Sequence, residues 1–261
     1  MKLRVFALSC HPDDIEFMMG GTLLLLAQEN CEIHYMNLAN GSCGTTELSR
    51  KDIINTRREE GRNAAARLGA VFHESLADDL KVFYHDELIR KLTAVIRRVA
   101  PDVLLLPSPE DYMEDHMNTS RVSVTAAFCR GMPNYHSIPQ TAPIDKDVVL
   151  YHALPYGLRD MLRRRVIPEF YLDVSAAMED KTALLACHAS QKRWLDESQG
   201  LDSYLNTMRE MTAEVGVMSG RYEYAEGWRR HNHLGFCAKE AAPLEELLSS
   251  RLMPEKSYEV N

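Results

Sequence analysis

The sequence predicts an α/β fold, a Rossmann-like open, mostly parallel sheet with helices on both faces. Two observations lead to this prediction. Apolar runs rich in β-forming residues alternate along the chain with segments of helical character. One of these runs, DVLLLP at 102–107, is almost entirely apolar, which is typical of a parallel strand covered on both faces. Such alternation favours a parallel sheet between two layers of helices.

The expected elements follow from this alternation. Strands are predicted at 3–9, 31–38, 70–73, 102–107 and 148–153. Helices are predicted at 15–29, 48–69, 86–100, 118–130, 176–194 and 203–214. Gly69 and Pro101 each follow a helical segment and are suitable helix stops.

The domain organisation is expected to be simple. A chain of 261 residues is within the range of one α/β domain. We expect a single domain over 1–261, with a Rossmann-like core at 1–130 and a completing and capping region at 131–261. The segment 131–146 carries three prolines and is expected to be a loop. The basic run RDMLRRR at 159–165 is expected to be a solvated helix face.

Composition excludes several classes of protein. The net charge of −8 and the absence of a basic stripe argue against a nucleic-acid partner. No run approaches 18 apolar residues, so no membrane span is expected, and the N-terminal apolar run is too short for a signal peptide. The six cysteines include no CxxC pair, which favours reduced thiols and a cytoplasmic location.

The chemistry concentrates where the first strand ends. His11, Asp13 and Asp14 follow the strand directly, and ligands of open α/β sheets bind beyond the carboxyl ends of the strands. Two adjacent carboxylates need a cation, and imidazole with carboxylate suits Zn²⁺ or another divalent ion such as Fe²⁺. His11 and Asp14 are three residues apart and can face one ion, which leaves Asp13 free to act as a base. A third ligand is expected from another strand end, and His116 is the only histidine in the loop after 102–107.

Four segments resemble the LmbE-like (PIG-L) family of zinc-dependent de-N-acetylases. HPDDIEFMMGGTL resembles the first family signature, and DYMEDHMNTSR occupies the place of the second. TRREEGRNAAARLGA is similar to the helix after the second strand, and ACHASQ to a late His-x-Ser-Gln motif. The resemblance extends over residues 3–191 with the segments in the family's order.

The resemblance implies an activity and roles for individual residues. His11, Asp14 and His116 resemble the metal ligands, Asp13 the general base, and Arg57 the arginine that faces the substrate. The implied reaction is hydrolysis of the amide of an N-acetylglucosamine-type sugar or conjugate, with Asp13 taking a proton from the attacking water. The implied partner is therefore a small N-acetylated amino sugar; the sequence leaves homo-oligomerisation open.

The second motif departs from the family pattern. It reads Met113-Glu114-Asp115-His116, where the family has a histidine at the position of Met113. That histidine is thought to stabilise the oxyanion or to protonate the leaving amine, and methionine can do neither. His188 is the candidate substitute, ahead of Tyr112 and Glu114, and Asp115 is also expected to be catalytic. Hydrolysis of a different amide and a non-catalytic sugar-binding relative remain alternatives.

Three smaller features complete the expectations. The loop NGSCGTTE at 40–47 is either a rim that touches substrate, through Asn40 and Gly41, or a plain connector. Gly20 and Gly21 are expected to allow a close approach of the backbone to its neighbours. His231 and His233 are two apart and would share a face on a strand, with structural roles expected ahead of a second metal site.

Overall fold

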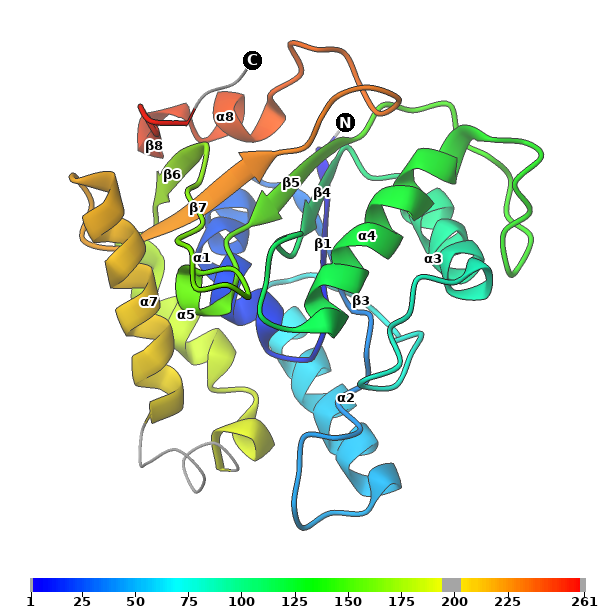
Figure 1. Cartoon of the computed structure of the whole chain (residues 1–261), viewed down its shortest axis with the longest axis horizontal. Coiled ribbons are helices and arrows are strands. Elements are labelled where there is room, and N and C mark those ends of the chain that lie inside the picture. The colour runs from blue at the N-terminus through cyan, green and yellow to red at the C-terminus, as the bar shows by residue number, and fades with distance from the viewer. Residues whose placement is uncertain (1, 194–202, 259–261) are drawn as a thin grey trace.

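An eight-stranded sheet runs through the computed structural model, which describes residues 2–193 and 203–258 (Figure 1). The strand order is β3-β2-β1-β4-β5-β7-β6-β8. The strands are β1 Arg4–Ser9, β2 Glu32–Asn37, β3 Val71–His73, β4 Val103–Leu106, β5 Val149–Ala153, β6 Phe170–Asp173, β7 Ala225–Arg230 and β8 Leu252–Pro254. The α/β class expected from the sequence is confirmed.

The five strands β1 to β5 are parallel to one another. In β1, Ala7 pairs with Tyr35 of β2 on one side and with Leu105 of β4 on the other. The carboxyl ends of β1 and β4 therefore lie side by side. This register brings the segment after Ser9 next to the segment after Leu106, the two places where the sequence predicts ligands.

The remaining half of the sheet is antiparallel. Strand β7 pairs antiparallel with both β5 and β6, and β8 pairs antiparallel with β6. The region 131–261 thus extends the sheet by four strands, and β6, β7 and β8 were not expected from the sequence. The segment AEGWRR of β7 lacks the apolar signature of a buried strand because its charged residues find partners only in the folded protein.

Helices cover both faces of the sheet. They are α1 Asp14–Gln28, α2 Arg50–Arg67, α3 Asp86–Val99, α4 Glu114–Phe128, α5 Met178–Leu185, α7 Ser203–Ser219 and α8 Pro243–Leu247. Alternate residues of β1 serve two separate cores. Val5 and Ala7 belong to the core shared with α1, α5 and α7, whereas Phe6 and Leu8 belong to the core shared with α3 and α4. Figure 1 shows α4 in front of the sheet and α1 behind it.

Three predicted elements need correction. Helix α4 begins at Glu114 rather than at residue 118, which puts His116 in its first turn. The helix predicted at 176–194 is divided, since α5 ends at Leu185 and a turn follows; residue 194 lies outside the described residues. The basic run is a loop, not a helix face, and Arg159 forms a β-bridge with Arg165.

Three further predictions concern a pair of histidines, the cysteines and membrane-spanning helices. Strand β7 ends at Arg230, so His231 and His233 do not share a strand face. All six cysteines are free, as expected. None of the helices in the described part of the chain is long and apolar enough to cross a membrane.

Candidate metal centre and its pocket

A cavity of about 360 Å³ opens at the carboxyl ends of β1 and β4. Its walls come from the start of α1, the loop after β2, helix α2, the start of α4, and α7. Of the predicted site residues, His11, Asp13, Asp14, Gly41, Arg57 and His116 line it. The fold therefore brings together residues from distant parts of the chain at the place expected for an open α/β sheet.

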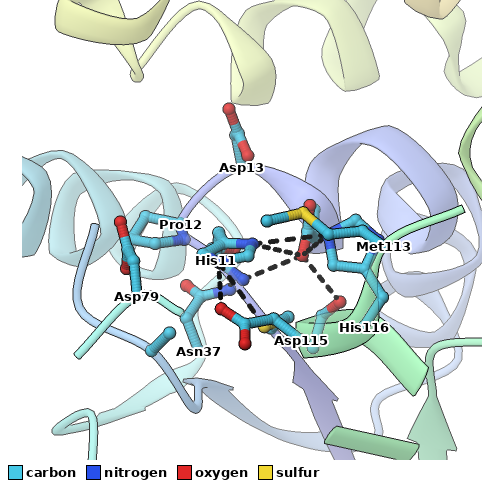
Figure 2. Close-up of polar contacts among 12 residues, drawn as sticks. His11, Pro12, Asp13, Asn37, Asp79, Met113, Asp115 and His116 are labelled. Atoms are coloured by element: carbon cyan, nitrogen blue, oxygen red, sulfur yellow. Dashed lines mark hydrogen bonds and ion pairs between the residues drawn. The ribbon is translucent and has the colours of Figure 1, made fainter. Parts of the chain in front are cut away.

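The turn from β1 into α1 separates two adjacent carboxylates. Asp13 has a φ of 102°, in the left-handed region that a residue with a side chain rarely adopts. This conformation costs on the order of 1–3 kcal/mol and is typical of functional sites. It directs Asp14 toward His11 and His116, whereas Asp13 points away from their contacts (Figure 2).

Three possible ligand atoms converge beside this turn. His11 Nδ1 lies 3.3 Å from His116 Nε2 and 3.8 Å from Asp14 Oδ2. His116 Nε2 lies 3.5 Å from the same Asp14 oxygen. In a tetrahedral site with Zn–N bonds of about 2.0–2.1 Å, neighbouring ligand atoms are roughly 3.3 Å apart. The trio thus has the spacing that a small divalent cation requires.

Two further carboxylates hold the histidine rings from behind. Asp115 Oδ2 lies 3.3 Å from His11 Nε2, and Asp111 Oδ1 lies 3.1 Å from His116 Nδ1 (Figure 2 shows the former pair). If each carboxylate accepts the N–H of its partner, the lone pairs of His11 Nδ1 and His116 Nε2 both face Asp14. Carboxylate–histidine pairs of this kind orient metal ligands in many proteins.

The carboxylates around His11 and His116 favour positive charge on these residues. Burial lowers the pKa of His116, but Asp14 and Asp111 outweigh it and raise that pKa to about 9. His11 behaves in the same way: burial opposes protonation, and Asp115 and Asp14 raise its pKa overall. Burial would raise the pKa of Asp14, yet His116 and His11 hold it below its usual value. A divalent cation can supply this charge in place of the protons.

Cys10 lies near the same histidine but faces its other nitrogen. Its Sγ is 3.7 Å from His11 Nε2, and the possible ligand atoms of Cys10, His11 and Asp14 lie within 4.8 Å of one another. Burial raises the pKa of the Cys10 thiol well above its usual value, so it stays protonated and is a poor ligand. His116 is therefore the better third member of the set.

Asp13 occupies a separate environment in the same pocket. Its Oδ2 accepts a 2.7 Å hydrogen bond from the hydroxyl of Tyr204, on α7, and lies 3.5 Å from Arg57 Nη2. Burial raises the pKa of Asp13, while Arg57 opposes that rise. A carboxylate that is ionised yet has a raised pKa is suited to accept a proton.

Arg57 is almost fully buried and shapes the loop above it. A Cβ on Gly41 would lie 2.8 Å from Arg57 Cγ, and one on Gly44 would lie 2.9 Å from Arg57 Nη1. Gly41 also has a φ of +77°. These two glycines are needed because the loop lies directly against the guanidinium. Asn40 does not line the cavity; its Nδ2 donates to Asp78 Oδ1 and fixes the loop.

The structure does not bring every predicted catalytic residue into the cavity. His188 is fully buried, and its Nε2 lies 3.2 Å from Glu16 Oε2, below the floor of the pocket. Asp115 does not line the cavity either and contacts His11 and the Leu80 N–H. From these positions His188 has no access to a substrate, and Asp115 positions His11.

Several residues of the site were missed by sequence reasoning. Asp111 lies in the loop before α4, five residues before His116, so its spacing could have suggested a role. Tyr204 had no signal, because it lies on a distant helix. Tyr112 and Tyr156 have ring centroids 5.9 Å apart, and Phe17 lies 5.5 Å from Tyr156, which gives the cavity one aromatic wall.

Known proteins similar to this chain include several deacetylases. The model of the family described as PIG-L, GlcNAc-PI de-N-acetylase, matches residues 6–127. The chain is 32% identical over 136 residues to the uncharacterized deacetylase YaiS of Escherichia coli K12, covering 49% of this chain and 69% of that protein. It is 29% identical to diacetylchitobiose deacetylase of Thermococcus kodakarensis, over 87% of this chain and 82% of that one.

Two further similarities are informative. The 4-oxalmesaconate hydratase of Pseudomonas putida is 26% identical over 84% of this chain and 85% of its own. Among solved structures, N,N′-diacetylchitobiose deacetylase from Pyrococcus horikoshii has a TM-score of 0.72 at 24% identity, over 92% of this chain and 88% of that chain. The fold is therefore shared with an enzyme of this kind, while one relative carries a different activity in its name.

Proposed function

The chain belongs to the PIG-L (LmbE-like) family, and on this premise we propose that it is a divalent-metal-dependent N-deacetylase. The proposed substrate is an N-acetylglucosamine-type sugar or conjugate, the class to which diacetylchitobiose belongs. The observation that carries the proposal is the convergence of His11, Asp14 and His116 beside Asp13 in one cavity. Two imidazoles and a carboxylate suit zinc or ferrous iron.

Within this proposal Asp13 is the general base. A bound cation would polarise the acetyl carbonyl and make the attacking water more acidic. Asp13 then accepts the proton of that water on its carboxylate, which the Tyr204 hydroxyl and the Arg57 guanidinium hold in place. In this mechanism Arg57 acts mainly on Asp13, which it keeps ionised.

The leaving amine must also receive a proton. Met113 cannot donate one, and His188 is buried against Glu16. The histidines that line the described cavity are His11 and His116, both assigned to the cation. We therefore propose that Asp13 returns the proton it has taken to the amine nitrogen, so that one carboxylate serves as base and then as acid.

The cavity has walls of two kinds, which fits a sugar. Tyr112 and Tyr156 offer ring faces to the C–H face of a pyranose, and the lining also holds the polar side chains of Arg57, Asp79 and Gln191. The volume of about 360 Å³ is within the range of small-ligand sites. The predicted substrate role of Gly41 stays in the proposal, whereas Asn40 is assigned to the support of the loop.

A hydratase is the second candidate. It is favoured by the similarity over 84% of this chain to 4-oxalmesaconate hydratase, together with the loss of the motif histidine at Met113. Addition of water to an activated double bond uses the same cation and base but has no leaving amine to protonate. The buried guanidinium of Arg57 would favour an anionic substrate of this kind.

Acetate release tests the proposal. Metal-loaded wild type is incubated with N-acetylglucosamine, N,N′-diacetylchitobiose and larger conjugates, beside the variants Asp13→Asn and Asp180→Asn. We expect release by the wild type, a loss of about 10²–10⁴-fold in kcat for Asp13→Asn with unchanged metal content, and normal release by Asp180→Asn, whose carboxylate is exposed on α5.

The other outcomes separate the alternatives. Absence of acetate from all substrates, with consumption of 4-oxalmesaconate by the wild type only, would replace deacetylation with hydration. Absence of both activities, with metal still bound, would indicate another amide substrate or a non-catalytic sugar-binding protein. Equal acetate release by wild type and Asp13→Asn would remove Asp13 from the mechanism.

A further inference from the structure

A second cavity, of about 410 Å³, lies on the face of the sheet that carries α4. It is bounded by α4, the end of β5 and the end of β7, and it has no lining residue in common with the candidate active-site pocket. Its volume is within the range of small-molecule sites. Nothing in the proposed reaction uses it.

Positive charge dominates the lining of this cavity. Arg121, Arg229 and Arg230 all line it, and its described lining contains no aspartate or glutamate. Arg229 Nη1 is paired with Glu110 at 2.6 Å, and Arg230 Nη2 lies 4.0 Å from Glu169. Arg121 lies over the ring of Tyr84, 5.0 Å from its centroid, and has no carboxylate within 4.0 Å among the described residues. Arg230 Nη1 also lies 4.0 Å from Glu245, so Arg229 and Arg230 both have carboxylate partners and Arg121 is the lining arginine without one among the described residues.

One of these cations also has an unused donor. The Nε of Arg229 is buried and has no hydrogen-bond partner in the described part of the chain. Its two terminal nitrogens are occupied, Nη1 by Glu110 and Nη2 by the hydroxyl of Ser108 at 2.9 Å. A buried donor without an acceptor is unfavourable, and most such groups are satisfied by water or a ligand.

Two neutral histidines add an acceptor. His152 Nδ1 lies 3.0 Å from the carbonyl of Pro107, which can only accept, so this nitrogen carries the proton. Burial lowers the pKa of His152 to about 3, which keeps the ring neutral. Its Nε2 must then accept from His231 Nδ1, 2.9 Å away. The pKa of His231 is also lowered by burial, so its Nε2 remains an acceptor for a hydroxyl.

We propose that this second cavity binds a small hydroxylated molecule that carries an oxyanion, either a phosphate ester or a carboxylate. Arg121 and Arg229 supply the donors for the oxyanion, and His231 accepts from a hydroxyl. The rings of Tyr84 and Tyr258 complete the walls. The proposal does not depend on the proposed deacetylase function, because the two cavities have separate linings.

Arg121→Gln is the variant that tests this site. Arg229 also holds Ser108 and Glu110 in the loop that leads to Asp111, so its replacement would disturb the candidate metal centre. Arg121 is exposed on α4 and has no such second role among the described contacts. Arg221→Gln is a matched control, because Arg221 is exposed and lies over Tyr222, 5.6 Å from the ring centroid, outside both cavities.

Binding is measured by calorimetry on the full chain, in a buffer free of phosphate and carboxylate, with glucose 6-phosphate, glucuronate and glucose. We expect one charged sugar to bind with one site per chain and glucose not to bind detectably. The preferred sugar identifies the oxyanion. Arg121→Gln should weaken this binding about tenfold, the effect of one charge-assisted hydrogen bond, and Arg221→Gln should leave it unchanged.

Four results would overturn the proposal. Glucose could bind as tightly as the charged sugars, or none of the three could bind at millimolar concentration. The two arginine variants could weaken binding equally, which would indicate a diffuse charge effect. Binding could be abolished by Arg57→Gln and unaffected by Arg121→Gln, which would assign it to the active-site pocket.

Discussion

Two clusters of charged side chains in this protein are both buried, but they differ in how fully their polar atoms are hydrogen-bonded. The first joins Lys181 of α5 to Glu226 of β7, with both side chains at most 3% exposed. Glu226 Oε1 accepts from Lys181 Nζ and the Gly21 N–H, and its Oε2 accepts from the N–H and hydroxyl of Thr22. Lys181 also donates to Thr212. Each carboxylate oxygen therefore has two donors.

The second cluster is the trio of His11, Asp14 and His116. It is also largely buried, but His11 Nδ1, His116 Nε2 and Asp14 Oδ2 face one another across 3.3–3.8 Å, while the other ring nitrogen of each histidine is paired with Asp115 or Asp111. The comparison teaches that burial of charge does not by itself indicate function. The lone pairs left without a donor distinguish the candidate metal centre from the ion pair that ties α1 to β7.

The largest effect is expected from breaking the complete cluster. Glu226→Gln leaves Lys181 buried without a counter-charge and should lower the free energy of unfolding by about 3–5 kcal/mol, or roughly 10 °C in Tm for a chain of this size. Thermal denaturation measures it. His116→Ala, at the incomplete cluster, should not lower Tm comparably in metal-free protein above pH 9, where His116 is neutral; an equal loss there would contradict the distinction.

The groups behind the histidines are expected to act through the metal. Asp115→Asn removes the carboxylate that holds His11 Nε2 and should weaken metal affinity about 10–100-fold. Competition with a chromophoric chelator measures this change. If Asp115 is instead catalytic, as the sequence suggested, the variant would bind metal normally and lose only kcat.

Two neighbouring glycines of α1 lie at different distances from the Lys181–Glu226 pair. A Cβ on Gly21 would lie 2.7 Å from Val174 Cβ and 2.9 Å from Glu226 Oε1, whereas one on Gly20 would meet only Lys181, at 3.3 Å. Gly21→Ala should cost about 1–3 kcal/mol through overpacking. Gly20→Ala should change stability far less, because alanine favours the helix by about 1 kcal/mol. Urea denaturation of both variants compares them, and equal stability would contradict the close approach at Gly21.

The smallest expected effect is the release of a proton from His116 when a metal binds. In metal-free protein the pKa of His116 is raised from 6.5 to about 9, so a metal must displace its proton at pH 7. Affinity should rise by up to tenfold per pH unit for this proton and level off above about pH 9. Because its pKa is raised in the folded state, protonated His116 stabilises metal-free protein below pH 6.5, and this contribution is lost as the pH rises through 9.

Calorimetry in two buffers with different ionisation enthalpies counts the released protons. His116→Gln, which has no such proton to lose, is the reference variant. A wild type that binds metal without proton release at pH 7 would show that His116 is not a ligand.

Much of the parallel half and part of the centre could be predicted from the sequence. Strands β1, β4 and β5 are apolar runs, β2 mixes apolar and polar residues, and His11, Asp14 and His116 follow two strand ends that a parallel sheet places together. The helix start at Glu114 was misjudged because Met113-Glu114 carries no side-chain cap signal, and indeed Met113 makes no cap hydrogen bond.

The assignment of partners within the site could not be predicted. His188 was expected in the pocket because it is a histidine in a family-like motif, but it lies against Glu16, which sequence reasoning treated as ordinary helix. Tyr204 is 191 residues from the aspartate it binds. Strand β7 was missed because its charged residues look exposed until Lys181 and Glu226 are seen to meet, and β6 and β8, of four and three residues, are too short to give a period.

The sequence by itself determined the α/β class and the chemical nature of the centre. The spacing and apolar character of residues in a strand are visible in a short stretch of sequence and indicate whether the strand is buried. At the end of the first strand, histidine and aspartates lie within a few residues of one another, so their ligand atoms are close without help from the rest of the fold. The tertiary structure alone decided that Asp115 and Asp111 contact the two histidines and that the Tyr204 hydroxyl holds Asp13. Those roles depend on distances and unused lone pairs between segments more than 100 residues apart in the chain, as for His11 and His116.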